Sequence, residues 1–228
     1  MITKIFLKLK SMPNQSILFA LIAADLMFAI IHIIHKVPSE IWVLLPDRAY
    51  SISEDRGLAE AFQYVQELWV TLAFLWLVYR YRRFAFVGFS LLFAFFLVDD
   101  MTSIHENLGA LSGKMFSNLQ ILQSFSNLRP DDFGELFISA MFGIGLFSII
   151  GLCYWRTDQP TRQIFHQVLG LLAVFIFFGV GIDFLDRFAS ARILQELLKL
   201  LEDGGEMLAM SLICWYAYLL CDKPAFPN

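Results

Sequence analysis

Phe84-Ala85-Phe86-Val87-Gly88-Phe89-Ser90-Leu91-Leu92-Phe93-Ala94-Phe95-Phe96-Leu97-Val98 is an apolar run without a charge, and Asp99-Asp100-Met101-Thr102-Ser103-Ile104-His105-Glu106-Asn107 follows it directly. A long uncharged run of this kind is typical of a membrane-spanning helix. Three arginines, Arg80, Arg82 and Arg83, precede the run, whereas carboxylates and an imidazole follow it. The two ends of the predicted span therefore differ in charge, which gives the span a direction.

The composition of the whole chain is that of an integral membrane protein. Hydrophobic residues make up 58% of the chain and charged residues 17%, whereas about a quarter of a soluble domain is charged. The three cysteines lie within or beside apolar runs without C-x-x-C spacing, so neither a disulfide framework nor a cysteine metal motif is expected. A net charge of −4 excludes nucleic acid as a partner. The partner that the composition predicts is the lipid bilayer.

About six segments approach the roughly twenty apolar residues that a helix needs to cross a bilayer. We expect an all-α bundle of about six transmembrane helices that forms one polytopic domain over residues 1–228. The third span is long enough only if its polar end continues as helix into the interface. The expected spans are Ser16–His35, Ala61–Tyr79, Phe84–Val98, Leu136–Tyr154, Ile164–Phe184 and Glu206–Leu220.

The distribution of lysine and arginine predicts the topology. With the N-terminus in the cytoplasm, the short inner loops and the tails carry basic residues that only Asp158 and Asp222 oppose. The positive-inside rule then places both termini in the cytoplasm, as in a multi-pass protein of the inner membrane. The basic residues on that side are Lys4, Lys8, Lys10, Arg80, Arg82, Arg83, Arg156, Arg162 and Lys223.

Short interfacial helices are expected in the loops on the outer side. Residues 108–129 place apolar side chains near helical spacing, which predicts an amphipathic surface helix. Residues 188–201 predict either another surface helix or an extension of the sixth span. Ser51 and Glu54 have capping-box spacing, so the second span should begin as helix well outside the hydrocarbon. Pro130 and the two aspartates after it predict the start of the fourth span.

Acids and histidines from five spans are expected at one level of the membrane. On one continuous helix, Asp99, Ser103 and Glu106 share a face, whereas His105 points about 100° away from Glu106. Carboxylates are costly in lipid, so these groups should face the bundle interior or water. The candidate metal ligands are Asp99, His105, Glu106, Glu202, Glu206, His32 and His35, and the candidates for a proton or ion pathway are Asp25, Glu60, Glu67 and Asp100.

Repulsion within such a cluster must be relieved by protons, by an arginine or by a bound cation. Mixed histidine and carboxylate ligands suit zinc, iron or manganese, and carboxylates alone suit calcium or magnesium. A divalent metal ion is therefore the expected cofactor. The alternative is structural, because acids at helix ends also serve as caps or face solvent. Asp183 and Arg187, at i,i+4 spacing, fit a structural ion pair.

Asp25 stands apart because it lies near the middle of the first span. It shares a helix face with His32, about 10.5 Å farther along the helix. A buried acid at this depth is by default a functional hypothesis, such as a proton relay. The alternative is a neutral carboxylic acid that forms a hydrogen bond with a serine or threonine of another helix.

Two local signatures resemble motifs of small polytopic bacterial inner-membrane proteins of unknown function. They are Asp99-Asp100-x4-His105-Glu106, of the form D-[DE]-x4-H-E, and Glu202-Asp203-x2-Glu206-Met207, of the form E-[DE]-x2-E-M. A weaker similarity is to zinc-dependent membrane hydrolases of the alkaline ceramidase and adiponectin-receptor type, which use three histidines and an acid within seven helices. This chain departs from that pattern because its last span contains no histidine.

Three functions are consistent with these patterns, and the sequence does not decide whether the chain is an enzyme. The first is an ion- or proton-handling protein, channel- or transporter-like, that would act as a homo-oligomer. The second is a non-catalytic sensor or a subunit of a partner membrane protein. The third is a metal-dependent hydrolase at lipid headgroup level, with a metal-bound water and a glutamate as base.

Overall fold

The structure is a computed structural model of the chain, and it describes residues 13–36, 48–116, 130–186, 189 and 191–222. Within these ranges the chain is all-helical, and six helices are long and apolar enough to cross a membrane. The expected all-α fold with six candidate spans is thereby confirmed. The long helices are α2 (Pro13–Lys36), α3 (Leu58–Tyr81), α4 (Val87–Thr102), α6 (Pro130–Trp155), α7 (Gln159–Ile176) and α9 (Arg192–Asp222), and the shorter elements are η2 (Arg48–Tyr50), η3 (Phe84–Phe86), α5 (Ile104–Phe116), the π-helical η5 (Phe177–Ile182) and α8 (Asp183–Asp186).

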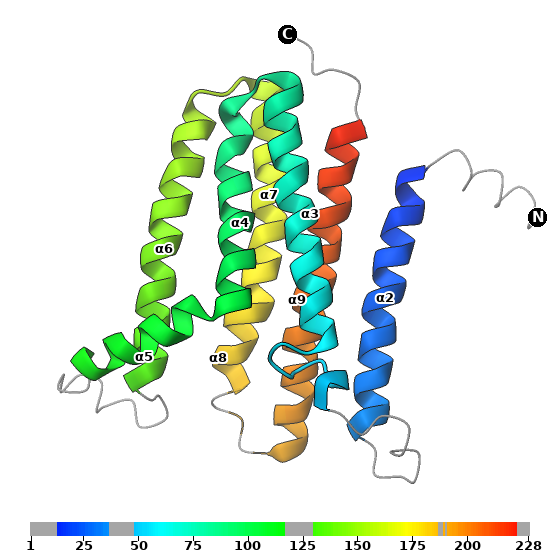
Figure 1. Cartoon of the computed structure of the whole chain (residues 1–228), viewed down its shortest axis with the longest axis vertical. Coiled ribbons are helices and arrows are strands. Elements are labelled where there is room, and N and C mark those ends of the chain that lie inside the picture. The colour runs from blue at the N-terminus through cyan, green and yellow to red at the C-terminus, as the bar shows by residue number, and fades with distance from the viewer. Residues whose placement is uncertain (1–12, 37–47, 117–129, 187–188, 190, 223–228) are drawn as a thin grey trace, which may run out of the picture.

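The elongated bundle has two chemically different ends (Figure 1). The turns from α3 to α4 and from α6 to α7 lie at one end, where α2 also begins and α9 also finishes. We call it the arginine end, because Arg82, Arg83 and Arg156 belong to these turns. The opposite end holds the junction of α4 with α5 and the glutamates of α9. We call it the acidic end.

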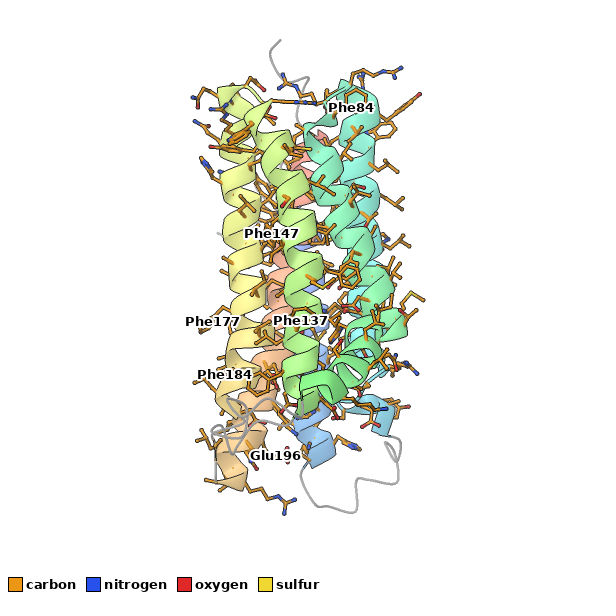
Figure 2. The ribbon with its side chains drawn as sticks, turned by 90° about the vertical axis from the view of Figure 1, so that its left-hand side faces the viewer. Phe84, Phe137, Phe147, Phe177, Phe184 and Glu196 are labelled. Atoms are coloured by element: carbon orange, nitrogen blue, oxygen red, sulfur yellow. The ribbon has the colours of Figure 1, made fainter. Side chains whose placement is uncertain are left out.

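Much of the outer surface of the bundle is apolar. Figure 2 shows side chains along its exterior, among them Phe137, Phe147, Phe177 and Phe184. Between 38% and 56% of each of these side chains is exposed. Soluble proteins rarely expose extended apolar surfaces. Lipid is therefore the solvent that this exterior fits.

The half of the bundle near the arginine end is filled by aromatic side chains. Phe74 of α3 stacks on Phe93 of α4, with ring centroids 5.9 Å apart. Phe89 of α4 lies 4.7 Å from Phe165 of α7, measured between centroids. These four residues are fully buried, and we call them the phenylalanine core. Polar side chains are held mainly in the other half.

Helix α3 begins later in the sequence than the capping-box pattern predicts. Ser51 and Glu54 lie in a turn, where the Glu54 N–H donates to the Ser51 carbonyl over 3.4 Å. The helix starts at Leu58, after Gly57, without a side-chain cap. The prediction was wrong because the Ser51 hydroxyl has a tertiary partner instead, Nδ1 of His32 at 3.2 Å.

The third span continues as helix past Val98, as expected, but it ends at Thr102. Ser103 adopts a left-handed conformation with φ of 49°, and its N–H donates to the Asp99 carbonyl over 2.6 Å. Helix α5 then leaves in a new direction across the acidic end (Figure 1). One continuous helix through Glu106, as the sequence suggested, is therefore wrong.

Helix α5 packs closely on α6 through glycine. A Cβ atom on Gly134 of α6 would collide with the carbonyl oxygen of Gly109 of α5. Small residues let two helix backbones approach in this way. Helix α5 covers the first part of the predicted surface helix over residues 108–129, and residues 117–129 lie outside the described ranges. For residues 192–201 the extension of the sixth span is confirmed, whereas Phe188 and Arg187, with its predicted ion pair, lie outside the described residues.

Candidate functional site

A polar cavity of about 300 Å³ lies at the acidic end, and we call it the acidic cavity. Helices α3, α4, α5 and α9 and the loop before α3 contribute to its wall. Carboxylates dominate the lining, and they come from segments far apart in the sequence. The polar lining residues are Ser53, Glu54, Asp55, Glu60, Gln63, Asp100, His105, Glu106, Glu202, Asp203 and Glu206.

Beneath the cavity lies Glu67 of α3, which is 0% exposed. Gln63, Asp100 and Glu206 all approach its carboxyl group closely enough to interact with it. Gln63 and Asp100 are near enough to act as hydrogen-bond partners, but neither Glu67 oxygen makes a hydrogen bond of good geometry within the described residues. We call Glu67, Asp100 and Glu206 the carboxylate triad. Three neighbouring carboxyl groups, one of them fully buried, are unfavourable in their ionised forms unless a proton or a cation relieves their repulsion.

Glu206 occupies a notch that the sequence analysis did not foresee. A Cβ atom on Gly179 would collide with the Glu206 carboxyl oxygen Oε1, so the carboxyl group can keep this position only beside glycine. Gly179 belongs to the π-helical segment η5, in which α7 gains a wider turn. Such π-helical segments in α-helices are frequent at functional sites. The sequence signal was the pair Gly179 and Gly181 in an otherwise bulky apolar run.

His105 is held in place by Asp99. Its backbone N–H donates to Asp99 Oδ1 over 2.9 Å, and its ring Nδ1 lies 2.8 Å from Asp99 Oδ2. The hydrogen bond with the Asp99 carboxylate raises the pKa of the imidazole, although partial burial acts in the opposite direction. Asp99, predicted as a ligand, therefore contacts His105 with both oxygens and positions it.

The break at Ser103 brings His105 and Glu106 to the same cavity, although a continuous helix would direct them apart. The side-chain amide of Asn107 stabilises the break by donating to the Ser103 carbonyl over 2.7 Å. His105 also borders a second cavity of about 200 Å³, lined by residues of α6, η5 and α8. The imidazole thus stands between two cavities.

The other predicted histidine ligands lie elsewhere. His32 is buried, and its Nδ1 accepts a hydrogen bond from the Ile52 N–H over 3.1 Å. A ring nitrogen that accepts is unprotonated, so His32 is neutral in this arrangement and anchors the loop before α3. Neither His32 nor His35 lines the acidic cavity. Among the described residues, no three histidine, cysteine or acidic side chains are grouped closely enough to hold one metal ion, so the metal site stays a prediction.

Asp25 belongs to a second polar group, on the side of the bundle where α2 packs on α9. Gln66 of α3 donates from Nε2 to the Ser211 hydroxyl of α9 over 2.8 Å, and both side chains are fully buried. Asp25 of α2 approaches the same serine. Neither Asp25 oxygen nor Oε1 of Gln66 has a hydrogen-bond partner in the described part of the chain. We call Asp25, Gln66 and Ser211 the polar core. Asp25 lies in the middle of α2, about 18 Å along the helix from its start.

Among the described residues, buried acids do not continue through the bundle toward the arginine end. Gln66 and Glu67 are adjacent in sequence, so the polar core and the carboxylate triad lie at nearly the same depth. Beyond them, Val70, Phe74 and Leu77 follow on α3, and each is 0% exposed. The phenylalanine core lies beside these residues. The described residues thus form a polar half, open at the acidic end, and an apolar half toward the arginine end.

Six apolar spans around buried carboxylates indicate a polytopic helical membrane protein. The sequence model described as Domain of unknown function (DUF8692) matches residues 16–221, and the chain belongs to this family. No curated protein and no solved structure was found to match the chain. A family of unknown function is consistent with the resemblance to proteins of unknown function, whereas the two motifs that suggested the resemblance stay untested.

Proposed function

We propose that the chain is an inner-membrane protein that binds protons or a small cation at the acidic cavity and acts in ion or proton handling. The observation that carries this proposal is the fully buried Glu67, whose oxygens make no hydrogen bond of good geometry among the described residues. Its neighbours Asp100 and Glu206 are also carboxyl groups. A purely structural acid would be expected to have a hydrogen-bond donor.

In this proposal the acidic cavity concentrates cations, and the carboxylate triad exchanges protons for them. Glu54, Asp55 and Glu60 lie at its wall and attract positive charge from the solvent. A cation that enters the triad replaces protons that Glu67, Asp100 and Glu206 hold when the site is empty. Asp25 is the next acid inward and would accept a proton from the triad through Gln66 and Ser211.

Passage across the membrane would require a further change in the bundle. Val70, Phe74 and Leu77 pack without exposed surface between the polar core and the arginine end. A hydrated ion does not pass a packed aromatic core. Transport would therefore need helix movement, a second copy of the chain or a partner membrane protein. We further propose that the arginine end and both termini face the cytoplasm, in keeping with the positive-inside rule.

Proton release on cation binding tests the proposed function. Purified protein in weakly buffered solution is titrated with calcium, manganese or zinc while the pH is recorded. We expect the wild type to release protons with a saturable dependence on at least one cation, and we expect Glu67→Gln to release fewer. Glu196→Gln is the matched control, because Glu196 is exposed, pairs with Lys36 and does not line the cavity. Equal release from all three proteins, or none from the wild type, would contradict the proposal.

A sensor or partner subunit is a second candidate, and the apolar half of the bundle favours it. Such a protein would bind a cation at the acidic end and signal this binding to another protein, and it would not transport the ion. Flux into liposomes separates the two functions. Cation-dependent proton release without flux favours the sensor, and flux that Glu67→Gln abolishes favours the transporter.

A metal-dependent hydrolase is a third candidate, and the contact of His105 with Asp99 favours it. Histidines that bind metals commonly hold their other ring nitrogen against a carboxylate. Zinc, iron, manganese and calcium would be measured by mass spectrometry in wild-type protein, His105→Ala and Glu206→Ala. Stoichiometric metal that both substitutions remove would support this candidate, since the metal would supply an activated water at headgroup level.

A further inference from the structure

Another cavity, of about 490 Å³, lies at the arginine end and is not part of the acidic site. It is formed where the turn from α3 to α4 faces the turn from α6 to α7. Arg82, Arg83 and Arg156 line it together with one acid, Asp158. The cavity is therefore strongly cationic, whereas the acidic cavity at the other end is strongly anionic.

The three arginines are not equivalent. Arg83 is held by the chain itself, because its guanidinium donates to the Asp158 carboxylate and to the Thr161 hydroxyl. Desolvation by itself would raise the pKa of Asp158, but hydrogen bonds with Thr161 and Arg83, together with the charge of Arg83, hold that pKa below its ordinary value. Arg82 and Arg156 are exposed, and neither pairs with a carboxylate among the described residues. Two guanidinium groups at the cavity thus lack a counter-charge from the described protein.

The backbone turn at Arg82 places the guanidinium charge of this residue at the edge of the bundle. Arg82 has a positive φ of 54°, which ends α3 and turns the chain toward η3. Its guanidinium carbon lies 5.8 Å from the ring centroid of Tyr79, which orients the side chain. A guanidinium offers several N–H donors in a plane, an arrangement that matches a phosphate group.

Apolar side chains border the same cavity. Phe84 is 76% exposed and Leu152 is 58% exposed, and both are lining residues. Trp155, beside Arg156 in sequence, is 79% exposed. Exposed aromatic residues next to arginines are typical of the level of lipid headgroups. The ligand that fits must therefore carry a negative charge for the arginines and an apolar part for Phe84 and Leu152.

We propose that this cavity binds an anionic phospholipid. The phosphate lies between Arg82 and Arg156, and the first part of an acyl chain contacts Phe84 and Leu152. Free inorganic phosphate could use the arginines but not the apolar border. The proposal is independent of the function of the acidic cavity, since no residue is shared between the two sites.

Lipid retention tests the proposal. The full chain, purified in mild detergent, is incubated with phosphatidylglycerol or with phosphatidylcholine, and bound lipid is counted by native mass spectrometry. We expect phosphatidylglycerol to be preferred in the wild type. Arg82→Gln and Arg156→Gln should each weaken its binding about fivefold, the effect of one basic contact at a membrane surface. Arg80→Gln is the matched control, because Arg80 is close in sequence but does not line the cavity.

The remaining outcomes are decisive in either direction. Equal retention of both lipids by the wild type, or undiminished retention by the double variant Arg82→Gln/Arg156→Gln, would overturn the proposal. Displacement of the lipid by millimolar inorganic phosphate would assign the site to free phosphate and would also overturn it. Arg82→Lys with Arg156→Lys keeps the charge and should retain an intermediate amount of phosphatidylglycerol. A thermal melt shows that each variant is folded before its retention is compared.

Discussion

At the scale of single residues, His105 provides the pH-dependent contact of the acidic cavity. Its pKa is raised above the ordinary value of 6.5 by Asp99, with smaller contributions from Glu106 and Asp100. A raised pKa means that the folded protein binds the proton more tightly than the unfolded chain. The contact therefore stabilises the fold fully below pH 6.5, and the contribution is lost as the pH rises through the raised pKa.

Substitution of His105 should therefore lower the stability of the protein at acidic pH and change it little at alkaline pH. We expect His105→Gln to lower the melting temperature at pH 5.5. The corresponding loss in the free energy of unfolding should be less than about 1 kcal/mol, because the side chain is partly exposed. Near pH 9 the variant and the wild type should melt alike, as far as this contact is concerned. Melting curves of both proteins from pH 5.5 to 9 measure the difference. A destabilisation that grows with pH would show that the imidazole is held in its neutral form.

Glu67 is the residue at which burial and function are expected to conflict. Its carboxyl group makes no hydrogen bond of good geometry among the described residues and lies beside two other acids. Glu67→Gln replaces the titratable carboxyl group by an amide of nearly the same volume, which stays neutral at every pH and offers N–H donors. We expect this variant to be more stable than the wild type at pH 8, by about 1 kcal/mol, the net worth of one hydrogen bond. Chemical denaturation at pH 8 measures it, and a clear loss of stability would mean that the carboxylate is satisfied in the native protein.

At the scale of elements, the π-helical segment η5 determines where Glu206 can lie. Its residue Gly179 leaves the space that the Glu206 carboxyl group fills, and Gly205 of α9 lies against the Phe178 ring in the same way. Helices α7 and α9 therefore fit together through two glycines at the level of the carboxylate triad. The site depends on this contact as much as on the acids themselves.

A methyl group at Gly179 should displace Glu206. Because the end of the Glu206 side chain can move aside, we expect Gly179→Ala to destabilise the protein by only about 1 kcal/mol, the low end of the cost of overpacking, and to weaken proton release at the acidic cavity. Gly170→Ala in the same helix is the control, because no atom lies within 4 Å of its added Cβ. That variant should be neutral or slightly more stable, since alanine favours helix. Equal effects of the two substitutions would show that the notch does not hold Glu206.

At the scale of the whole molecule, the two ends of the bundle should face different compartments. Single cysteines would be placed at Asn107, at the acidic end, and at Gln159, at the arginine end. Both positions are exposed. In a background without Cys153, Cys214 and Cys221, a membrane-impermeant maleimide should label position 107 in intact spheroplasts and position 159 only after permeabilisation. The reverse pattern would overturn the proposed topology.

Hydrophobic pattern alone predicted much of the fold. The six expected spans correspond to six long helices in the structure, because runs such as Leu136–Tyr154 satisfy the length and polarity that a bilayer demands. The extension of the third span to Thr102 was also predicted from the sequence. The start of α3 and the break at Ser103 were not predicted. A capping partner in another segment and a single left-handed residue produce no periodic pattern in the sequence.

The sequence determined which end of each span is acidic, since charge and position along a helix are local properties. Only the tertiary structure decided which acids meet: Glu67 joins Asp100 and Glu206, Asp99 holds His105, and His32 anchors a loop away from the cavity. It also showed that Gly179 makes room for Glu206 and that, among the described residues, buried acids do not continue toward the arginine end. These relations depend on how helices rotate and pack against one another, and periodicity within one helix does not contain that information.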